Sequence, residues 1–398
     1  MFNPALDQLP PYPFQRLRDL IDRFEPPKGL EPLVMSIGEP QHPAPALVNR
    51  VLAENGNTWG KYPPVPGTDS LKQAIADWLR NRYSLPDGAL NADQHILPVV
   101  GTREALFLIA NLITPPEKNG QRPAIAMPNP FYQVYAGGAV MHGADPVYLA
   151  ATRETGFQPD LDQLDSALLD RLAALYICSP GNPQGSVASA AYWEKAITLA
   201  RAHDFVLIAD ECYAEIYDKT PPPGALEVAQ AMGGGFDNIL VFHSLSKRSN
   251  VPGLRSGFVA GDPKIVQAFS HLRSYGGATM PLPLMAVSEA LWKDEKHVEE
   301  NRRLYREKFD LADELLGGKL GYYRPDGGFF LWLDVGDGED AAIKLWREGA
   351  VRVIPGGYLA GNQPDGFNPG KAFIRVALVH DAETTRQALT RIADILGG

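Results

Sequence analysis

Residues 238–257 read NILVFHSLSKRSNVPGLRSG, in which an apolar run from Ile239 to Phe242 leads into the polar sequence Ser244-Leu245-Ser246-Lys247. The apolar run is continuous rather than alternating, which is what a strand needs when both of its faces are buried. Four other runs of this kind occur in the chain: HILPVVG (95–101), PAIAMP (123–128), ALYICSP (174–180) and FVLIAD (205–210). Together they predict a mostly parallel sheet.

Helical patterns separate several of these strands. Leu71, Ile75, Trp78 and Leu79 recur at the spacing i, i+4, i+7 and i+8, which is typical of an amphipathic helix. Residues 193–203 form another helical stretch between the third and fourth runs. The alternation of strands with helices predicts the α/β class.

The last hundred residues follow a different pattern. A long charged amphipathic helix is predicted over 296–316, ending at Gly317-Gly318. It is followed by a strand in GGFFLWLDV (327–335), a helix around 340–349, the strand AFIRVALV (372–379) and a final helix. This part of the chain predicts a second, smaller α+β domain. The first 40 or so residues are rich in proline and indicate an extended arm rather than a core element.

Composition limits the classes of partner. The chain has 398 residues, 45% hydrophobic and 21% charged, and its net charge is −10 with no block of Lys or Arg. This balance argues against nucleic acid or an anionic membrane surface as the main partner. Cys178 and Cys212 have neither a C-x-x-C nor a Cys/His spacing, so we expect no metal site, no disulfide and two buried thiols in a reducing compartment. We find no signal sequence or membrane span and therefore expect a cytoplasmic protein.

Polar or glycine-rich residues follow each of the five predicted strands. They are Gly101-Thr102-Arg103-Glu104, Asn129-Pro130-Phe131-Tyr132, Ser179-Pro180-Gly181-Asn182-Pro183, Asp210-Glu211-Cys212-Tyr213 and Ser244-Leu245-Ser246-Lys247. Ligands of open α/β sheets lie beyond the carboxyl ends of the strands. Taken singly, Thr102 and Asp210 could be helix caps, Asn182 a turn residue and Lys247 a solvated lysine. Five such segments at one sheet edge favour an active site.

Arg375 lies inside the predicted strand 372–379, where an unpaired charge would be costly to bury. The guanidinium therefore needs an anionic partner, and a substrate carboxylate would match it with two hydrogen bonds.

Several motifs together resemble the class I/II aminotransferases. Arg255 follows Lys247 by eight residues, as in the lysine signature of that family. The motifs SIGEP (36–40), SPGNPQG (179–185), ADECY (209–213) and FIRVA (373–377) occur in the family's order and at its usual spacings. The resemblance covers essentially the whole chain, and no dinucleotide-binding or P-loop motif competes with it. It implies fold type I of the pyridoxal-phosphate (PLP) enzymes, with an N-terminal arm and part of the small domain in 1–45, a large PLP-binding domain in 46–290 and a small C-terminal domain in 291–398.

The resemblance also implies roles for individual residues. Lys247 would carry PLP as a Schiff base and then move the proton between the substrate Cα and the cofactor. Asp210 would keep the pyridine nitrogen protonated. Asn182 and Tyr213 would hydrogen-bond the phenolate oxygen of the cofactor, and Tyr132 would stack on its ring.

The same resemblance implies how the anionic groups are bound. The residues expected around the phosphate are Thr102 and Arg103 through their backbone, with Ser244, Ser246 and Arg255. Arg375 would bind the substrate α-carboxylate, near Asn182 and the backbone of Gly38. Tyr62 matches a tyrosine that reaches the phosphate of the neighbouring subunit, which implies a homodimer with shared active sites.

The N-terminal sequence suggests a substrate. NPALDQLPPYPFQRLRDL (3–20) followed by SIGEPQHPAP (36–45) resembles the bacterial N-succinyldiaminopimelate aminotransferases of lysine biosynthesis, which implies 2-oxoglutarate as the acceptor. The chain has no clear match for the second arginine with which aspartate aminotransferase binds a dicarboxylate side chain.

Three alternatives stay open. One is another class I/II aminotransferase with an aspartate, alanine or aromatic donor, and another is a carbon–sulfur lyase of the same fold. The third is a non-catalytic PLP-binding regulator, which is the least supported because no basic helix-turn-helix segment precedes the fold.

Overall fold

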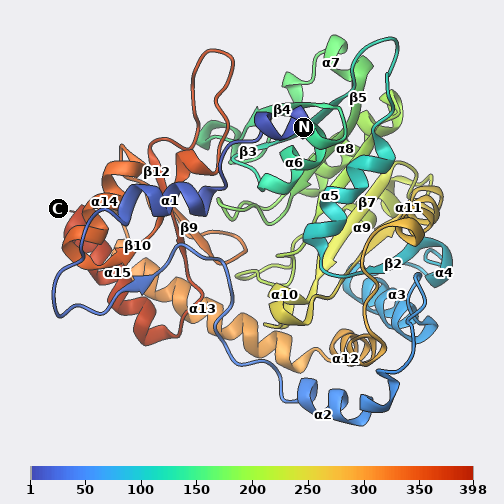
Figure 1. Ribbon diagram of the computed structural model, residues 1–398, viewed down its shortest axis with the longest axis horizontal. Helices are drawn as coiled ribbons and strands as arrows, with labels where there is room; N and C mark the ends of the chain where they lie inside the picture. The colour runs from blue at the N-terminus through green and yellow to red at the C-terminus, as the bar shows by residue number, and fades with distance from the viewer. Residues whose placement is uncertain (1, 398) are drawn as a thin grey trace.

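The five apolar runs form five strands of one seven-stranded sheet in the computed structural model, which describes residues 2–397 (Figure 1). The strand order is β2-β8-β7-β6-β5-β3-β4. Their bounds are β2 Ile96–Val99, β3 Ala124–Asn129, β4 Asp145–Ala150, β5 Leu172–Cys178, β6 Val206–Asp210, β7 Ile239–Ser244 and β8 Gly257–Gly261. Strand β8 runs antiparallel to both of its neighbours, and the other neighbouring strands pair in parallel. The predicted α/β class with a mostly parallel sheet is confirmed.

Two antiparallel pairings leave β2 pointing in the same direction as β7. The carboxyl ends of all five predicted strands therefore meet at one edge of the sheet, as expected. The sequence analysis did not predict β4 and β8. Strand β8 has only five residues, GFVAG, and follows a long loop, while most residues of β4 are half-buried. Neither strand has the long apolar run by which the others were found.

Helices cover both faces of this sheet (Figure 1). Successive residues of β6 belong to two different cores, Leu207 and Ala209 to one and Ile208 to the other, because side chains alternate across a strand. Helices α3, α8, α9 and α12 contribute to the first core, and α5, α6 and α11 to the second. Their bounds are α3 Asp69–Tyr83, α5 Thr102–Ile113, α6 Gln133–Met141, α8 Ala190–His203, α9 Ala225–Met232, α11 Pro263–Tyr275 and α12 Leu282–Lys293.

The C-terminal part has its own core and a small antiparallel sheet of order β11-β12-β9. Its elements are α13 Lys296–Leu316, β9 Phe330–Asp334, α14 Gly338–Gly349, β10 Val351–Arg352, β11 Ile354–Pro355, β12 Phe373–Ala377 and α15 Ala382–Leu396. The predicted long helix does end at Gly317, and the predicted strands and helices after it are present. The division of the chain at residues 45 and 290 stays a prediction, which limited proteolysis would test.

The expectation of an extended N-terminal arm is wrong for residues 13–34. Helix α1 spans Pro13–Ile21 and buries Leu17, Leu20 and Ile21 in the C-terminal core, and β1 (Leu33–Val34) pairs in parallel with β10. The three apolar residues have the spacing i, i+3 and i+4 of an amphipathic helix. The prolines misled the prediction, because Pro13 occupies the first helical position, where no backbone donor is required.

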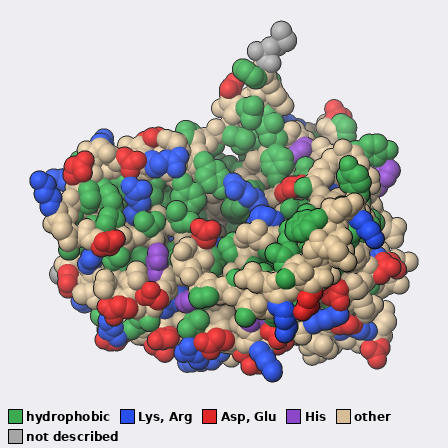
Figure 2. Space-filling model, turned by 60° about the horizontal axis from the view of Figure 1, so that its bottom comes forward, with side chains coloured by type: hydrophobic (Ala, Val, Ile, Leu, Met, Phe, Trp, Pro, Cys, Tyr) green, Lys and Arg blue, Asp and Glu red, His purple; other side chains and the backbone are tan. Residues whose placement is uncertain are grey.

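Shorter elements complete the chain. They are η1 Pro4–Gln8, α2 Leu47–Glu54, η2 Gly56–Thr58, α4 Ala92–His95, η3 Arg153–Thr155, η4 Leu161–Gln163, α7 Ser166–Arg171, α10 Leu245–Arg248, η5 Pro252–Leu254 and η6 Gly356–Tyr358. Basic and acidic side chains are interspersed over the face shown in Figure 2, with no area of one sign. None of the helices formed by residues 2–397 is both long and apolar enough to cross a membrane.

Candidate active site

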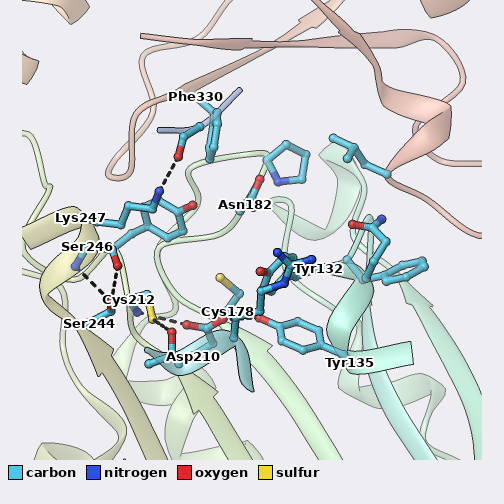
Figure 3. Close-up of a pocket in the computed structure, with 18 of the residues that line it drawn as sticks. Tyr132, Tyr135, Cys178, Asn182, Asp210, Cys212, Ser244, Ser246, Lys247 and Phe330 are labelled. Atoms are coloured by element: carbon cyan, nitrogen blue, oxygen red, sulfur yellow. Dashed lines mark hydrogen bonds between the residues drawn. The ribbon is translucent and has the colours of Figure 1, made fainter. Parts of the chain in front are cut away.

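A cavity of about 560 Å³ lies at the carboxyl edge of the large sheet (Figure 3). Its walls come from the strand ends, from the N-terminal segment and from the C-terminal part of the chain. All but one of the predicted site residues line it: Gly38, Thr102, Arg103, Tyr132, Asn182, Asp210, Tyr213, Ser244, Ser246, Lys247, Arg255 and Arg375. The five polar segments that follow the strands therefore do converge on one site.

Lys247 belongs to α10, a single helical turn directly after β7. Ser244 caps this turn, because its Oγ accepts a hydrogen bond from the Ser246 backbone N–H at 3.1 Å. The Lys247 Nζ donates a hydrogen bond to the Gly38 carbonyl and lies 5.1 Å from the centre of the Phe329 ring. Burial lowers the pKa of Lys247 to about 8. The amine therefore gives up its proton more readily than an ordinary lysine does, as a nucleophile and proton acceptor must.

Asp210 ends β6 and is buried at the bottom of the cavity (Figure 3). One carboxylate oxygen accepts a hydrogen bond from the Tyr135 hydroxyl at 2.5 Å, and the other accepts one from the Cys212 backbone N–H at 3.3 Å. Burial raises the pKa of Asp210, and the hydrogen bond from Tyr135 opposes that rise. The Asp210 carboxylate can accept a further hydrogen bond, so it could bind a cation or a protonated ring nitrogen in the cavity.

Hydrogen-bond donors, including the Arg255 guanidinium, gather in another part of the cavity, at the N-terminus of α5. Gly101 precedes this helix with a φ of +75°, and a Cβ added there would lie 2.2 Å from an Arg255 nitrogen. The Arg255 guanidinium is thus packed against the first turn of α5, whose backbone N–H groups have no intrahelical partners. The hydroxyls of Ser244 and Ser246 lie 3.0 Å apart in the same region. Such a set of donors is suited to a phosphate group.

Arg375 projects from β12 into the cavity, where its side chain is buried. It donates hydrogen bonds to the Asn182 side-chain oxygen at 3.0 Å and to the Ser36 carbonyl at 2.8 Å, and it stacks over the Phe330 ring at 4.2 Å. Within residues 2–397 no carboxylate lies within ion-pair distance of this guanidinium. Burial without an acidic neighbour lowers the pKa of Arg375 to about 10. The anionic partner expected from the sequence is therefore not another side chain.

Tyr62 is the predicted site residue that does not line the cavity. Its side chain is fully exposed, with a relative exposure of 101%. A place in the site of a second subunit stays a prediction for this residue.

Several lining residues were not predicted from the sequence. They are Tyr12, Pro13, Phe14, Ile37, Pro128, Phe131, Gln133, Tyr135, Cys178, Pro183, Cys212, Pro252, Phe330 and Leu359. Tyr135 could have been found, since it lies three residues after Tyr132, in the first turn of the helix that begins there. Tyr12 and Phe14 gave no signal, because nothing local indicates that the N-terminal segment returns to the sheet. Both thiols, expected to be buried, are partly exposed to the cavity.

The chemistry of these groups fits one cofactor. An amine with a lowered pKa, a buried carboxylate and the N-terminus of a helix surround a single cavity, and PLP has an aldehyde, a basic ring nitrogen and a phosphate. Lys247, Asp210 and the first turn of α5 would bind those three groups respectively.

Comparisons with known proteins show which family the chain belongs to. The family model described as aminotransferase class I and II matches residues 31–392. The crystal structure of an aminotransferase from Neisseria meningitidis is 40% identical, covers 99% of this chain and 100% of that chain, and superposes with a TM-score of 0.94. An LL-diaminopimelate aminotransferase of Syntrophobacter fumaroxidans is 30% identical over 97% of both chains. A 4-dedimethylamino-4-oxo-anhydrotetracycline transaminase of Streptomyces rimosus is also 30% identical, over 97% of this chain and 99% of that protein. The chain therefore belongs to the class I and II aminotransferases, which are PLP-dependent enzymes that act on amino acids and 2-oxo acids.

Proposed function

We propose that this aminotransferase transfers the amino group of N-succinyl-L,L-diaminopimelate to 2-oxoglutarate, as a cytoplasmic enzyme of lysine biosynthesis. The observation that carries this proposal is the arrangement of cations in the cavity. Arg375 is free to bind an α-carboxylate, while Arg255 is packed against α5 and Arg103 is turned toward Tyr12, whose hydroxyl lies 3.4 Å away. No further arginine among residues 2–397 lines the cavity, so the chain itself supplies no second arginine for the side-chain carboxylate of a short dicarboxylate.

The relatives support the diaminopimelate skeleton. Proteins from Moorella thermoacetica and Syntrophobacter fumaroxidans, which are 28% and 30% identical to this chain, are named LL-diaminopimelate aminotransferases. LL-diaminopimelate itself is therefore the second candidate for the donor. The tetracycline transaminase is also 30% identical to this chain, and its name indicates a quite different substrate. The amino donor of this chain must therefore be measured.

The roles that we propose follow from the geometry. PLP supplies, when bound, the aldehyde and the electron-withdrawing ring on which amino-group transfer depends. Lys247 would hold the cofactor, and its amine would take the proton from the substrate Cα. Asp210 would keep a proton on the ring nitrogen of the cofactor. Arg375, held by Asn182, would bind and orient the α-carboxylate of the substrate.

The remaining lining residues would hold the cofactor in place. Tyr132 would cover the ring, and Tyr213 would donate its hydroxyl to the ring oxygen. The phosphate would be bound by Thr102, Arg103, Ser244, Ser246 and Arg255, and the Gly38 backbone would border the substrate. We further propose a homodimer in which Tyr62 of each chain completes the phosphate site of the other.

A comparison of amino donors at saturating 2-oxoglutarate tests the substrate. We expect N-succinyl-L,L-diaminopimelate to give a far higher kcat/KM than aspartate, alanine or phenylalanine. Free LL-diaminopimelate should be poor, because its distal ammonium replaces a neutral amide. A higher kcat/KM with the free diamine would support the second candidate instead. Comparable rates with aspartate or phenylalanine would refute both and leave the cofactor chemistry unchanged.

The same assay separates transfer from elimination. A carbon–sulfur lyase would release pyruvate and ammonia from cystathionine without consuming 2-oxoglutarate. We expect no such release, and glutamate formation that depends on both substrates.

A further inference from the structure

We propose that Asn301 of α13 is a positioning residue for amino-group transfer, because it fixes the helical turn that carries Lys247. Asn301 lies outside the cavity and comes from the C-terminal part of the chain. The inference rests on the proposed role of Lys247 and adds a residue that no motif of the sequence indicates.

The turn that carries Lys247 is too short to hold itself in place. Helix α10 has four residues, Leu245–Arg248, so its last carbonyl groups have no partners within the helix. Asn301 supplies the missing donor: its Nδ2 lies 3.0 Å from the Lys247 carbonyl and 3.2 Å from the Arg248 carbonyl. The side chain of a helix distant in sequence thus caps the turn at Lys247 itself.

Asn301 is in turn held firmly. Its side-chain oxygen accepts a hydrogen bond from the Asn250 side chain at 2.7 Å, and the residue is only 3% exposed. Asn250 adopts a left-handed conformation, with a φ of +52°, where the chain leaves α10. The Asn301 side-chain amide therefore connects the end of α10 to Asn250, where the chain changes direction. A buried amide with all of these contacts made resists displacement, since each lost partner would leave an unsatisfied polar group.

The same face of α13 makes two more contacts with the surroundings of Lys247. Tyr305 and Lys308 follow Asn301 at i+4 and i+7, which places the three side chains in one row. Tyr305 stacks on Phe329, with 5.4 Å between ring centres, and the Lys247 amine lies 5.1 Å from the centre of the same Phe329 ring. The fully buried Lys308 contacts the His42 ring nitrogen at 2.8 Å, at the end of the segment that includes Gly38. The row thus supports both the backbone of Lys247 and the segment whose carbonyl accepts its hydrogen bond.

The test compares Asn301→Asp with the wild-type holoenzyme. Aspartate has nearly the same shape but no donor, and its oxygens would face two carbonyl oxygens. We expect kcat to fall roughly 10- to 100-fold, because the Lys247 amine is no longer held beside the substrate. The KM for the amino donor should stay unchanged, since Arg375 is not affected.

A spectroscopic readout without substrate accompanies the kinetics. The absorbance of the bound cofactor depends on the protonation of the Lys247 nitrogen that is bonded to it, so a displaced turn should shift the pH midpoint of the absorption change. Val298→Ala is the matched control, because Val298 is buried on the same helix, at 1% exposure, and is not among the hydrogen-bonding partners of the turn. It should lower Tm and leave kcat, KM and the pH midpoint unchanged.

Normal kcat and a normal pH midpoint in a folded Asn301→Asp variant would overturn the inference. If that variant does not fold, Asn301→Ala, which removes the donor without adding charge, should show the same two changes. Parallel losses in Val298→Ala would also overturn it, since they would trace the effect to stability. The Lys247→Ala variant separates the proposed role of Lys247 from that of Asn301. Full activity of Lys247→Ala would refute the proposed function. An inactive Lys247→Ala variant together with a fully active Asn301→Asp variant would refute only the role of Asn301.

Discussion

Arg375 is buried and Lys247 is half-buried, and among residues 2–397 neither has an acidic neighbour close enough to form an ion pair. Burial lowers the pKa of both groups, so each is held in the folded chain at a cost in stability. Such costs are typical of functional sites, where side chains are arranged for a ligand and not for the fold. They can be measured.

Replacing Lys247 by methionine should stabilise the PLP-free protein at pH 7. The folded pKa of Lys247, about 8, lies below the ordinary value of about 10.4 for an unfolded lysine. The unfolded chain therefore binds more protons between these two values, and stability rises with pH across that window. The buried amine costs at most about 3 kcal/mol at pH 7 and nothing above the upper value. Urea unfolding should give the variant a higher free energy of unfolding than the wild type at pH 7, and this difference should disappear at about pH 10.5. Equal free energies of unfolding at pH 7 would contradict the prediction.

Arg375→Lys should raise KM for every amino donor and 2-oxo acceptor alike, because each carries an α-carboxylate. A lysine cannot replace the two parallel hydrogen bonds of the guanidinium, a loss of about 2–4 kcal/mol, or roughly 30- to 1000-fold in kcat/KM. Steady-state kinetics with several donors checks this. An effect limited to one substrate would show that Arg375 binds a side chain instead.

The elements of the site meet where chain segments approach each other very closely. The N-terminus of α5 packs against Arg255 because Gly101 has no side chain, and its φ of +75° favours glycine independently. A side chain at position 101 would therefore strain the backbone and collide with Arg255, at the helix N-terminus that we propose as the phosphate-binding site.

Gly101→Ala should therefore weaken PLP binding. A Cβ would displace Arg255 from the phosphate site, and the loss of charge-assisted hydrogen bonds, about 1.5–3 kcal/mol, corresponds to a Kd for PLP that is roughly 10- to 100-fold higher. Gly120→Ala is the control: its φ is +72°, and a Cβ there meets nothing within 4 Å. Titration of both variants with PLP should show a weaker Kd in the first alone, and equal affinities would remove Arg255 from the phosphate site.

At the scale of the whole molecule, the exposed Tyr62 makes the proposed dimer testable. A Tyr62→Phe variant and a Lys247→Ala variant should each be impaired at every site of their own homodimers. Mixed dimers should regain activity, because one of their two sites combines an intact Lys247 with an intact Tyr62 from the other chain. Activity of isolated mixed dimers measures this, and verified mixed dimers no more active than the average of the two parents would refute shared sites.

The local sequence was sufficient for most of the large sheet. Strands β2, β3, β5, β6 and β7 are buried on both faces and therefore have continuous apolar runs, which no other element of this chain shows so plainly. Because these strands share one direction, the polar residues after them had to meet at one edge. Twelve of the thirteen predicted site residues line one cavity for this reason, together with the motifs of the family.

Tertiary structure alone decided the contacts between distant segments. Helix α1 was mistaken for an arm because its apolar face has meaning only against the C-terminal core. In β8 the glycines at both ends leave an apolar run of only three residues, too few to show a pattern. No local pattern could indicate that Ser36 binds Arg375 or that Asn301 binds the Lys247 turn. Periodicity indicates which side of an element is buried, but a hydrogen bond between residues far apart in the sequence depends on how the completed elements pack.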